Sequence, residues 1–371
     1  MTGKELLNIS QAHQNMMLAG DGQFTKDCHD WLQKNTGCYK ALLTHSCTAA
    51  LEMAAILANI EPGDEVIMPS YTFVSTSNAF VLRGGVPVFV DIRKDTLNID
   101  EGMIEAAITP HTKAIVPVHY AGVACEMDTI MDIAHRHNLM VIEDAAQGVM
   151  STYKGRPLGT IGHLGCYSFH ETKNIISGEG GALLINKPEL TVRAEFIRDK
   201  GTDRSSFFRG EIDKYTWIDI GSSYLPGEIT AAFLLAQMEE AESITQRRLN
   251  LWNYYHKAFE SLEYAGLLRR PIIPDNCEHN GHMYYLILPN MKYRDMFIEY
   301  MMKMGVCCVF HYIPLHLSPF GKQYCNSAMN LSITKDLSDR VVRLPLWIGM
   351  NDEIGGVIKA VFHVLDSIEN N

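Results

Sequence analysis

The feature that most constrains the fold is a regular alternation of short apolar segments with helical segments. Apolar runs typical of buried strands cover residues 41–43, 65–68, 86–91, 114–119, 139–144, 166–169 and 182–186. Helical periodicity lies between most of them, at 48–58, 74–82, 99–108 and 127–137. This alternation predicts βαβ units and an α/β fold with a parallel or mostly parallel sheet.

The rest of the chain is less regular. Residues 1–40 are poorly patterned and predict an N-terminal arm with one helix over 25–33, whereas 200–224 is loop-like and rich in aromatic and basic residues. A strand at 283–288, a helix at 293–304, a strand at 306–311 and a helix at 352–368 predict a small α+β domain. With 371 residues, two domains are expected, a large one at 1–245 and a small C-terminal one at 246–371.

Charge and hydropathy exclude several classes of protein. The net charge of −11 argues against nucleic acid or an anionic membrane as a partner. The longest apolar candidate, 41–60, is interrupted by His45 and Glu52, and the first residues lack the apolar core of a signal peptide. We therefore expect a cytoplasmic protein.

Motif searches narrow the chemistry further. The nine cysteines include no C-x-x-C pair and no Cys/His cluster, so we predict neither a disulfide nor a structural metal. Neither glycine cluster completes G-x-G-x-x-G, and the P-loop, H-E-x-x-H and G-x-S-x-G motifs are absent. Nicotinamide, P-loop and serine-hydrolase chemistry are therefore disfavoured.

Ligands of parallel sheets gather at the carboxyl ends of the strands, and Lys173 falls just after such an end. Partial desolvation there would lower the pKa of its amine and favour the neutral form that attacks a carbonyl to form a Schiff base. The alternative is a solvated surface charge, as for most of the 32 lysines and arginines.

Three features upstream of Lys173 are suited to bind the ligand whose carbonyl group the lysine would attack. Cys47 and Thr48 open a helix after Ser46, which predicts either a phosphate seat or ordinary capping. Asp144 ends an apolar strand, where it can cap a helix or hold a proton on a ring nitrogen, and Gln147 can donate to the same ligand or be a surface residue. With Phe73 as a stacking ring, this ordered set predicts a site for pyridoxal 5′-phosphate (PLP).

The sequence resembles the DegT/DnrJ/EryC1/StrS sugar-nucleotide aminotransferases from about residue 20 to the C-terminus. The motifs that carry the resemblance lie at 44–51, 69–73, 117–119, 143–147, 168–174 and 311–316. The resemblance implies a PLP-dependent transferase of fold type I, similar to aspartate aminotransferase.

It also implies roles for individual residues. Lys173 would bind the cofactor covalently, Asp144 would pair with the pyridine nitrogen, Phe73 would lie on one ring face and Gln147 near the 3′ oxygen. Cys47, Thr48 and Ser168 would hold the phosphate. Many family members have G-x-N-x-R where this chain has residues 221–225, so Ser223 replaces an asparagine that reaches the neighbouring subunit's phosphate.

The implied activity is amino transfer from L-glutamate to a dTDP-linked keto sugar, by a homodimer with shared active sites. Residues 117–127, 168–174 and 207–224 are most similar to members that aminate dTDP-4-keto-6-deoxy-D-glucose for surface-polysaccharide biosynthesis (lipopolysaccharide and enterobacterial common antigen). Another keto position, another nucleotide and a non-catalytic regulator on the same fold are the alternatives. Lys173 disfavours the dehydrating branch, which has histidine at that position.

Five residues are candidates for substrate binding, and each has an alternative role. His311 and Tyr312 can line the sugar pocket or pack inside the small domain. Lys200, Arg204 and Arg209 can bind the substrate diphosphate or be solvated loop charges.

Overall fold

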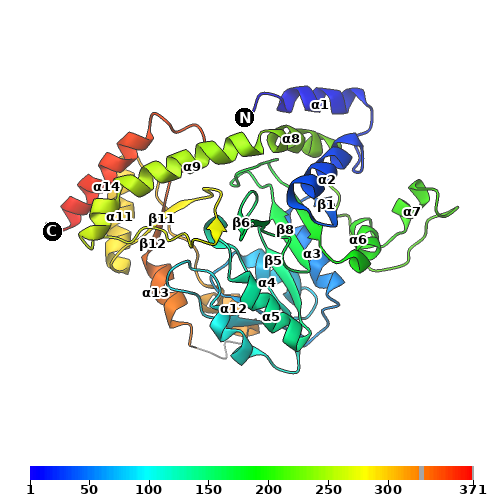
Figure 1. The fold of residues 1–371 in the computed structure, drawn as a ribbon, viewed down its shortest axis with the longest axis horizontal. Helices are drawn as coiled ribbons and strands as arrows, with labels where there is room; N and C mark the ends of the chain where they lie inside the picture. The colour runs from blue at the N-terminus through cyan, green and yellow to red at the C-terminus, as the bar shows by residue number, and fades with distance from the viewer. Residues whose placement is uncertain (326–329, 370–371) are drawn as a thin grey trace.

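A central seven-stranded sheet organises the computed structural model, which describes residues 1–325 and 330–369 (Figure 1). In spatial order the strands are β1 (Lys40–Thr44), β9 (Gly181–Ile185), β8 (Leu164–Ser168), β5 (Met140–Asp144), β4 (Thr112–Ile115), β2 (Glu65–Pro69) and β3 (Val86–Val90). Strand β9 is antiparallel to both of its neighbours, β1 and β8, and all other neighbouring pairs in this sheet are parallel. The predicted mostly parallel sheet is therefore confirmed, and the carboxyl ends of the other strands meet at one edge.

Helices cover both faces of this sheet because successive strand residues point to opposite sides. Leu42 packs into the core under α3, α4 and α6, whereas Ala41 and Leu43 pack into the core under α2, α5 and α8. The bounds are α3 (Cys47–Leu57), α4 (Val74–Val81) and α6 (Thr191–Arg198) on one face, and α2 (Gln23–Thr36), α5 (Met127–His137) and α8 (Glu228–Glu239) on the other.

The C-terminal part has a hydrophobic core of its own. Its elements are α9 (Ala241–Ala258), α10 (Glu260–Tyr264), the antiparallel pair β11 (Tyr284–Ile287) and β12 (Val341–Leu344), α11 (Met291–Lys303) and α14 (Ile354–Glu369). Figure 1 shows α9 as one long helix leading from α8 to this part. The expected boundary at residue 245 falls inside α9, and the division into two domains stays a prediction.

The remaining elements are short. They are α1 (Glu5–Gln14), α7 (Arg204–Phe208), α12 (Pro319–Tyr324), α13 (Ser332–Arg340), the three-stranded sheet of β6 (Thr152–Tyr153), β7 (Arg156–Pro157) and β10 (Cys277–Glu278), and the 3₁₀ turns η1 (Glu101–Met103), η2 (Glu105–Ala107), η3 (Tyr120–Gly122), η4 (Pro188–Leu190) and η5 (Leu315–Leu317). Within the described ranges, no helix has both the length and the apolar character needed to span a bilayer.

Two predicted elements are wrong. The helix expected over 99–108 is replaced by two 3₁₀ turns, η1, which Asp100 caps, and η2; Gly102 within this segment lowers its helix propensity. The strand expected over 306–311 forms only one bridge, between Val309 and Arg343. Helix α1 was not anticipated; its contacts are tertiary, such as the bond from Asn8 Nδ2 to the Ala232 carbonyl.

Candidate active site

A cavity of about 520 Å³ opens at the carboxyl edge of the sheet. Its walls come from segments far apart in the sequence, because strand ends, the start of α3 and the C-terminal part all reach this edge. The predicted site residues that line it are Cys47, Thr48, Phe73, Asp144, Gln147, Ser168, Lys173, His311 and Tyr312.

Lys173 reaches the cavity from a tight turn after β8. The turn is closed by the bond from the Lys173 amide to the His170 carbonyl, 2.9 Å long. Burial lowers the pKa of the Lys173 amine, while the thiol of Cys47 and the carboxylate of Asp144 act in the opposite direction and Arg343 lowers it further. Lys173 forms no ion pair with the described residues, so its amine is available for chemistry.

Asp144 ends β5 and is almost fully buried. Its Oδ2 accepts a hydrogen bond from Thr76 Oγ1 at 2.7 Å, and its Oδ1 accepts one from the Ala146 amide at 3.2 Å. No cation forms an ion pair with it in the described part of the chain. A buried carboxylate held by neutral donors alone is costly unless a ligand brings the missing positive charge.

The start of α3 forms another wall. Ser46 Oγ accepts from the Ala49 amide at 3.1 Å, so Ser46 is the capping residue. Helix geometry leaves the amides of Cys47 and Thr48 without intrahelical partners, and both residues line the cavity. Capping by Ser46 therefore still leaves these two amides free to bind an anion, and Ser168 also lines the cavity.

Gln147, Tyr312 and Phe73 also line the cavity. Gln147 Oε1 accepts from the Ala121 amide at 2.7 Å, and its Nε2 donates to the Tyr312 hydroxyl at 3.2 Å. The Phe73 ring lies 6.4 Å from that of Tyr312 but stays 57% exposed. An aromatic ring left this exposed beside a cavity can stack on a planar ligand.

His311 is a buried residue of the cavity lining. Its Nδ1 lies 3.1 Å from the Tyr120 hydroxyl, and burial lowers its pKa to about 2. The imidazole is therefore neutral at ordinary pH, and Arg343 lowers its pKa further.

Arg343, Thr76 and Ser75 are lining residues that sequence reasoning missed. Arg343 lies on β12, and its Nε is buried without a partner. The side chain forms no ion pair with the described residues. The position of Arg343 within the otherwise apolar run 341–344 was a sequence signal for a functional residue. No such signal marked Thr76 and Ser75.

These residues fit PLP. The buried, unpaired carboxylate of Asp144 suits a pyridinium nitrogen, the free amides of α3 suit a phosphate, and the amine of Lys173 suits an aldehyde.

Four predicted residues lie elsewhere in this chain. Ser223 is exposed, Lys200 and Arg204 pair with Asp199, and Arg209 pairs with Glu195 and Glu211. None of the four lines the cavity.

Comparisons with a family model, with curated proteins and with solved structures agree with one another. The model of the DegT/DnrJ/EryC1/StrS aminotransferase family matches residues 1–362. The spore coat polysaccharide biosynthesis protein SpsC of Bacillus subtilis is 35% identical over 88% of this chain and 85% of its own. GDP-perosamine synthase of Caulobacter vibrioides is 32% identical over 98% of this chain and 96% of its own. The PLP form of Spr1654 from Streptococcus pneumoniae, named as a sugar aminotransferase, superposes with a TM-score of 0.91 at 25% identity, covering 99% of this chain and 97% of its own.

Proposed function

Because the chain belongs to the DegT/DnrJ/EryC1/StrS family of PLP-dependent sugar aminotransferases, we propose its substrates: L-glutamate and dTDP-4-keto-6-deoxy-D-glucose. The products are 2-oxoglutarate and dTDP-4-amino-4,6-dideoxy-D-galactose. One observation carries the proposal, namely the single cavity that joins the Lys173 amine, the Asp144 carboxylate and the first amides of α3.

When bound, PLP supplies an aldehyde for the amino group and a ring that accepts electrons. In the proposed mechanism, the Lys173 amine would take the proton from the donor Cα and pass it to the cofactor side, and in the second half-reaction it would deliver a proton to the sugar carbon that receives the amino group. Asp144 keeps a proton on the ring nitrogen, and Thr76 Oγ1 fixes the orientation of that carboxylate. Cys47, Thr48 and Ser168 hold the phosphate, and Phe73 covers one ring face.

We assign substrate recognition to the cavity residues that have no role in holding the cofactor. Glutamate brings carboxylates, and Arg343 has a guanidinium facing the cavity without an acidic partner, so we assign the donor carboxylate to Arg343. His311 is neutral and Tyr312 is hydrogen-bonded to Gln147, which makes them suitable to contact sugar hydroxyls.

The names of two relatives bear on the pathway and on the nucleotide. SpsC is named for spore coat polysaccharide biosynthesis, and GDP-perosamine synthase is named for a GDP-linked amino sugar. The first supports a role in surface polysaccharides, and the second makes the nucleotide part of the test.

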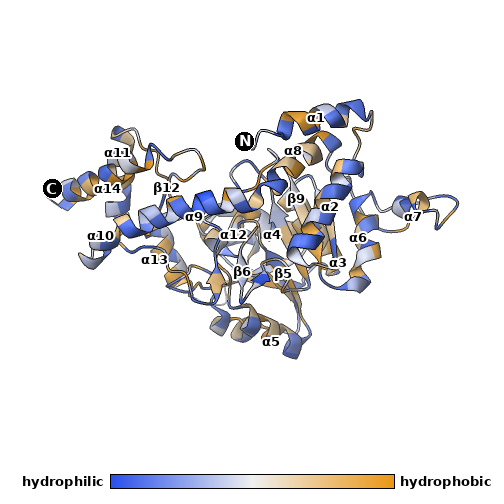
Figure 2. Ribbon diagram, turned by 45° about the horizontal axis from the view of Figure 1, so that its top comes forward, coloured by the Kyte–Doolittle hydropathy of each residue, from blue (hydrophilic) through white to orange (hydrophobic). Residues whose placement is uncertain are grey.

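A homodimer with shared sites is part of the proposal. Figure 1 shows α7 and its loop projecting from the body, and Figure 2 shows apolar residues on α7. Phe208 is 69% exposed and Trp217 is 79% exposed. A second copy would cover these side chains and bring Ser223, Lys200, Arg204 and Arg209 to the partner's cavity.

Product analysis tests the substrate assignment. The PLP-loaded protein is given glutamate and either dTDP- or GDP-4-keto-6-deoxy sugars, and NMR identifies the aminated carbon and its configuration. We expect an axial 4-amino product from the dTDP sugar. An equatorial amine, another carbon or a preference for GDP would replace the substrate assignment, and the absence of any amination would favour a non-catalytic regulator.

A further inference from the structure

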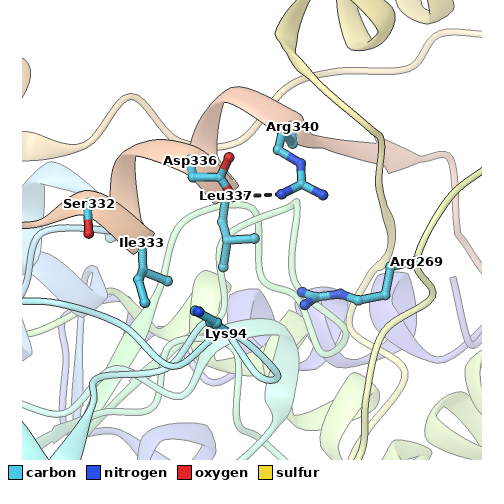
Figure 3. Close-up of a pocket in the computed structure, with 7 residues that line it drawn as sticks. All are labelled: Lys94, Arg269, Ser332, Ile333, Asp336, Leu337 and Arg340. Atoms are coloured by element: carbon cyan, nitrogen blue, oxygen red, sulfur yellow. Dashed lines mark hydrogen bonds and ion pairs between the residues drawn. The ribbon is translucent and has the colours of Figure 1, made fainter.

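A second pocket, of about 390 Å³, lies outside the proposed active site (Figure 3). It is formed by Lys94 from the loop after β3, Arg269 from the segment before β11, and Arg340 with Asp336 from α13. None of these residues lines the cavity that holds Lys173. Lys94 is more than 170 positions from Arg269 and Arg340 in sequence, and those two are about 70 positions apart, so only the folded chain brings the three cationic side chains together.

Arg269 is the central residue of this pocket. Figure 3 shows its guanidinium directed into the hollow between Lys94 and Arg340. Two of its nitrogen atoms, Nε and Nη2, are buried without a hydrogen-bond partner. Burial lowers the pKa of Arg269 and the positive charge of Arg340 lowers it further, while Tyr285, Asp95 and Glu263 act in the opposite direction. A half-buried guanidinium in this state lacks the anion that normally compensates its charge.

The carboxylates near Arg269 are already engaged with other residues. Asp95 accepts two hydrogen bonds from Arg93, at 3.0 and 2.8 Å. Asp336 accepts from Arg340 Nη1 at 2.6 Å, and Glu263 accepts from Arg270 Nε at 2.7 Å.

The other two cations also have unused donors. Arg340 uses Nη1 for Asp336 and Nε for the Leu288 carbonyl, 2.8 Å away, which leaves Nη2. Lys94 is exposed and forms no ion pair among the described residues. The pocket therefore has three cations and one carboxylate, and that carboxylate is already paired.

We propose that this pocket binds the phosphate group of a small organic phosphate. Guanidinium groups and a lysine converging on one space are the donors that proteins use for phosphate. The volume lies within the range of small-molecule sites, about 300–1,000 Å³. Ile333 and Leu337 supply an apolar wall for the organic part.

Binding would connect two parts of the chain. Asp91, just before Lys94, already accepts hydrogen bonds from the Ile333 and Thr334 amides at the start of α13, at 3.0 and 2.7 Å. A phosphate held by Lys94, Arg269 and Arg340 would add a second connection between the β3 loop and the C-terminal part. Ligand binding at this pocket therefore stabilises the protein against heat.

Calorimetric titration of the PLP-loaded protein tests this site. The probes are glucose 1-phosphate, inorganic phosphate and, as a neutral control, glucose. We compare the wild type with Arg269→Met and Lys94→Met, and use Lys335→Met, an exposed lysine of α13 outside this pocket, as the matched control.

We expect one phosphate-dependent site whose affinity falls at least tenfold in Arg269→Met and Lys94→Met, with no change in Lys335→Met. The melting temperature should rise with glucose 1-phosphate in the wild type and in Lys335→Met only. Tighter binding of glucose 1-phosphate than of inorganic phosphate supports a site for an organic phosphate. No binding, binding that persists in Arg269→Met, or binding of inorganic phosphate alone would overturn the proposal.

Discussion

At the scale of single residues, the proposed site depends on charges that the protein leaves without partners. Lys173, Asp144 and Arg343 all line one cavity, yet none is in an ion pair with the described residues. Desolvation makes each unpaired charge unfavourable, so each is a place where a ligand can contribute binding free energy. A lysine amine with a lowered pKa, a carboxylate and a guanidinium match an aldehyde, a pyridinium nitrogen and a substrate carboxylate, respectively.

Lys173→Ala should abolish covalent attachment of PLP. After borohydride reduction, mass spectrometry should find the cofactor on the wild type and on Lys113→Ala, an exposed control, but not on Lys173→Ala. Turnover should fall by at least about 10²–10⁴-fold because the acid–base group is lost. Cofactor fixed to the Lys173→Ala protein would show that another lysine carries it.

Asp144→Ala should weaken PLP binding by roughly 10–100-fold, the value of a hydrogen bond to a charged group. Thr76→Val removes only one of the two donors to Asp144 and should have a smaller effect. Fluorescence titration of the apoprotein with PLP measures both. Equal affinities in the wild type and Asp144→Ala would mean that another group faces the ring nitrogen.

Arg343→Met should raise the KM for glutamate by roughly 10–100-fold. It should also raise the pKa of Lys173 in the apoprotein, since the positive charge of Arg343 disfavours a protonated amine nearby. The pH–rate profile of PLP attachment should therefore lie at higher pH in Arg343→Met than in the wild type or in the exposed control Arg247→Met. An unchanged KM would remove Arg343 from the donor site.

At the scale of elements, the start of α3 is positioned by β9. A Cβ on Gly181 would lie 2.4 Å from the Cys47 amide nitrogen and 2.4 Å from the Ser46 carbonyl carbon. Only glycine lets the strand approach so closely, and this contact fixes where the free amides of α3 point.

Gly181→Ala should therefore displace the start of α3 and weaken PLP binding. The loss of binding free energy should exceed the loss of unfolding free energy. Gly355→Ala is the matched control, because no atom lies within 4 Å of its new Cβ and the residue is in α14. That control should be neutral or stabilising by up to about 1 kcal/mol. Titration with PLP and thermal unfolding test the pair, and normal PLP affinity in Gly181→Ala would contradict this role of β9.

At the scale of the whole molecule, exposed aromatic side chains around α7 predict a partner surface. Trp217→Ser should raise the dimer dissociation constant and lower activity, because Ser223 and its basic neighbours would no longer reach a second cavity. Tyr264→Ser, at a residue that is 84% exposed on α10, should change neither. Sedimentation velocity and activity measure the effect, and an active wild-type monomer would refute shared sites.

Much of the sheet was predictable, because buried strands and amphipathic helices leave local periodic patterns. Failures occurred where contacts distant in sequence decide the structure. The apolar run at 306–311 lacks a continuous partner strand, so it forms one bridge with β12 instead of a strand. Helix α1 has weak local signals and depends on packing against α8.

The sequence by itself determined the kind of sheet, the placement of Lys173, Asp144, Phe73 and Thr48 at or after strand ends, and thereby the cofactor. These features are local, since a strand end and a helix start are encoded within a few residues. Only the tertiary structure decided which distant groups meet them: Thr76 on Asp144, Arg343 beside Lys173, and Lys94 with Arg269 and Arg340 at the second pocket. Such meetings depend on how helices and strands pack, and no local pattern records them.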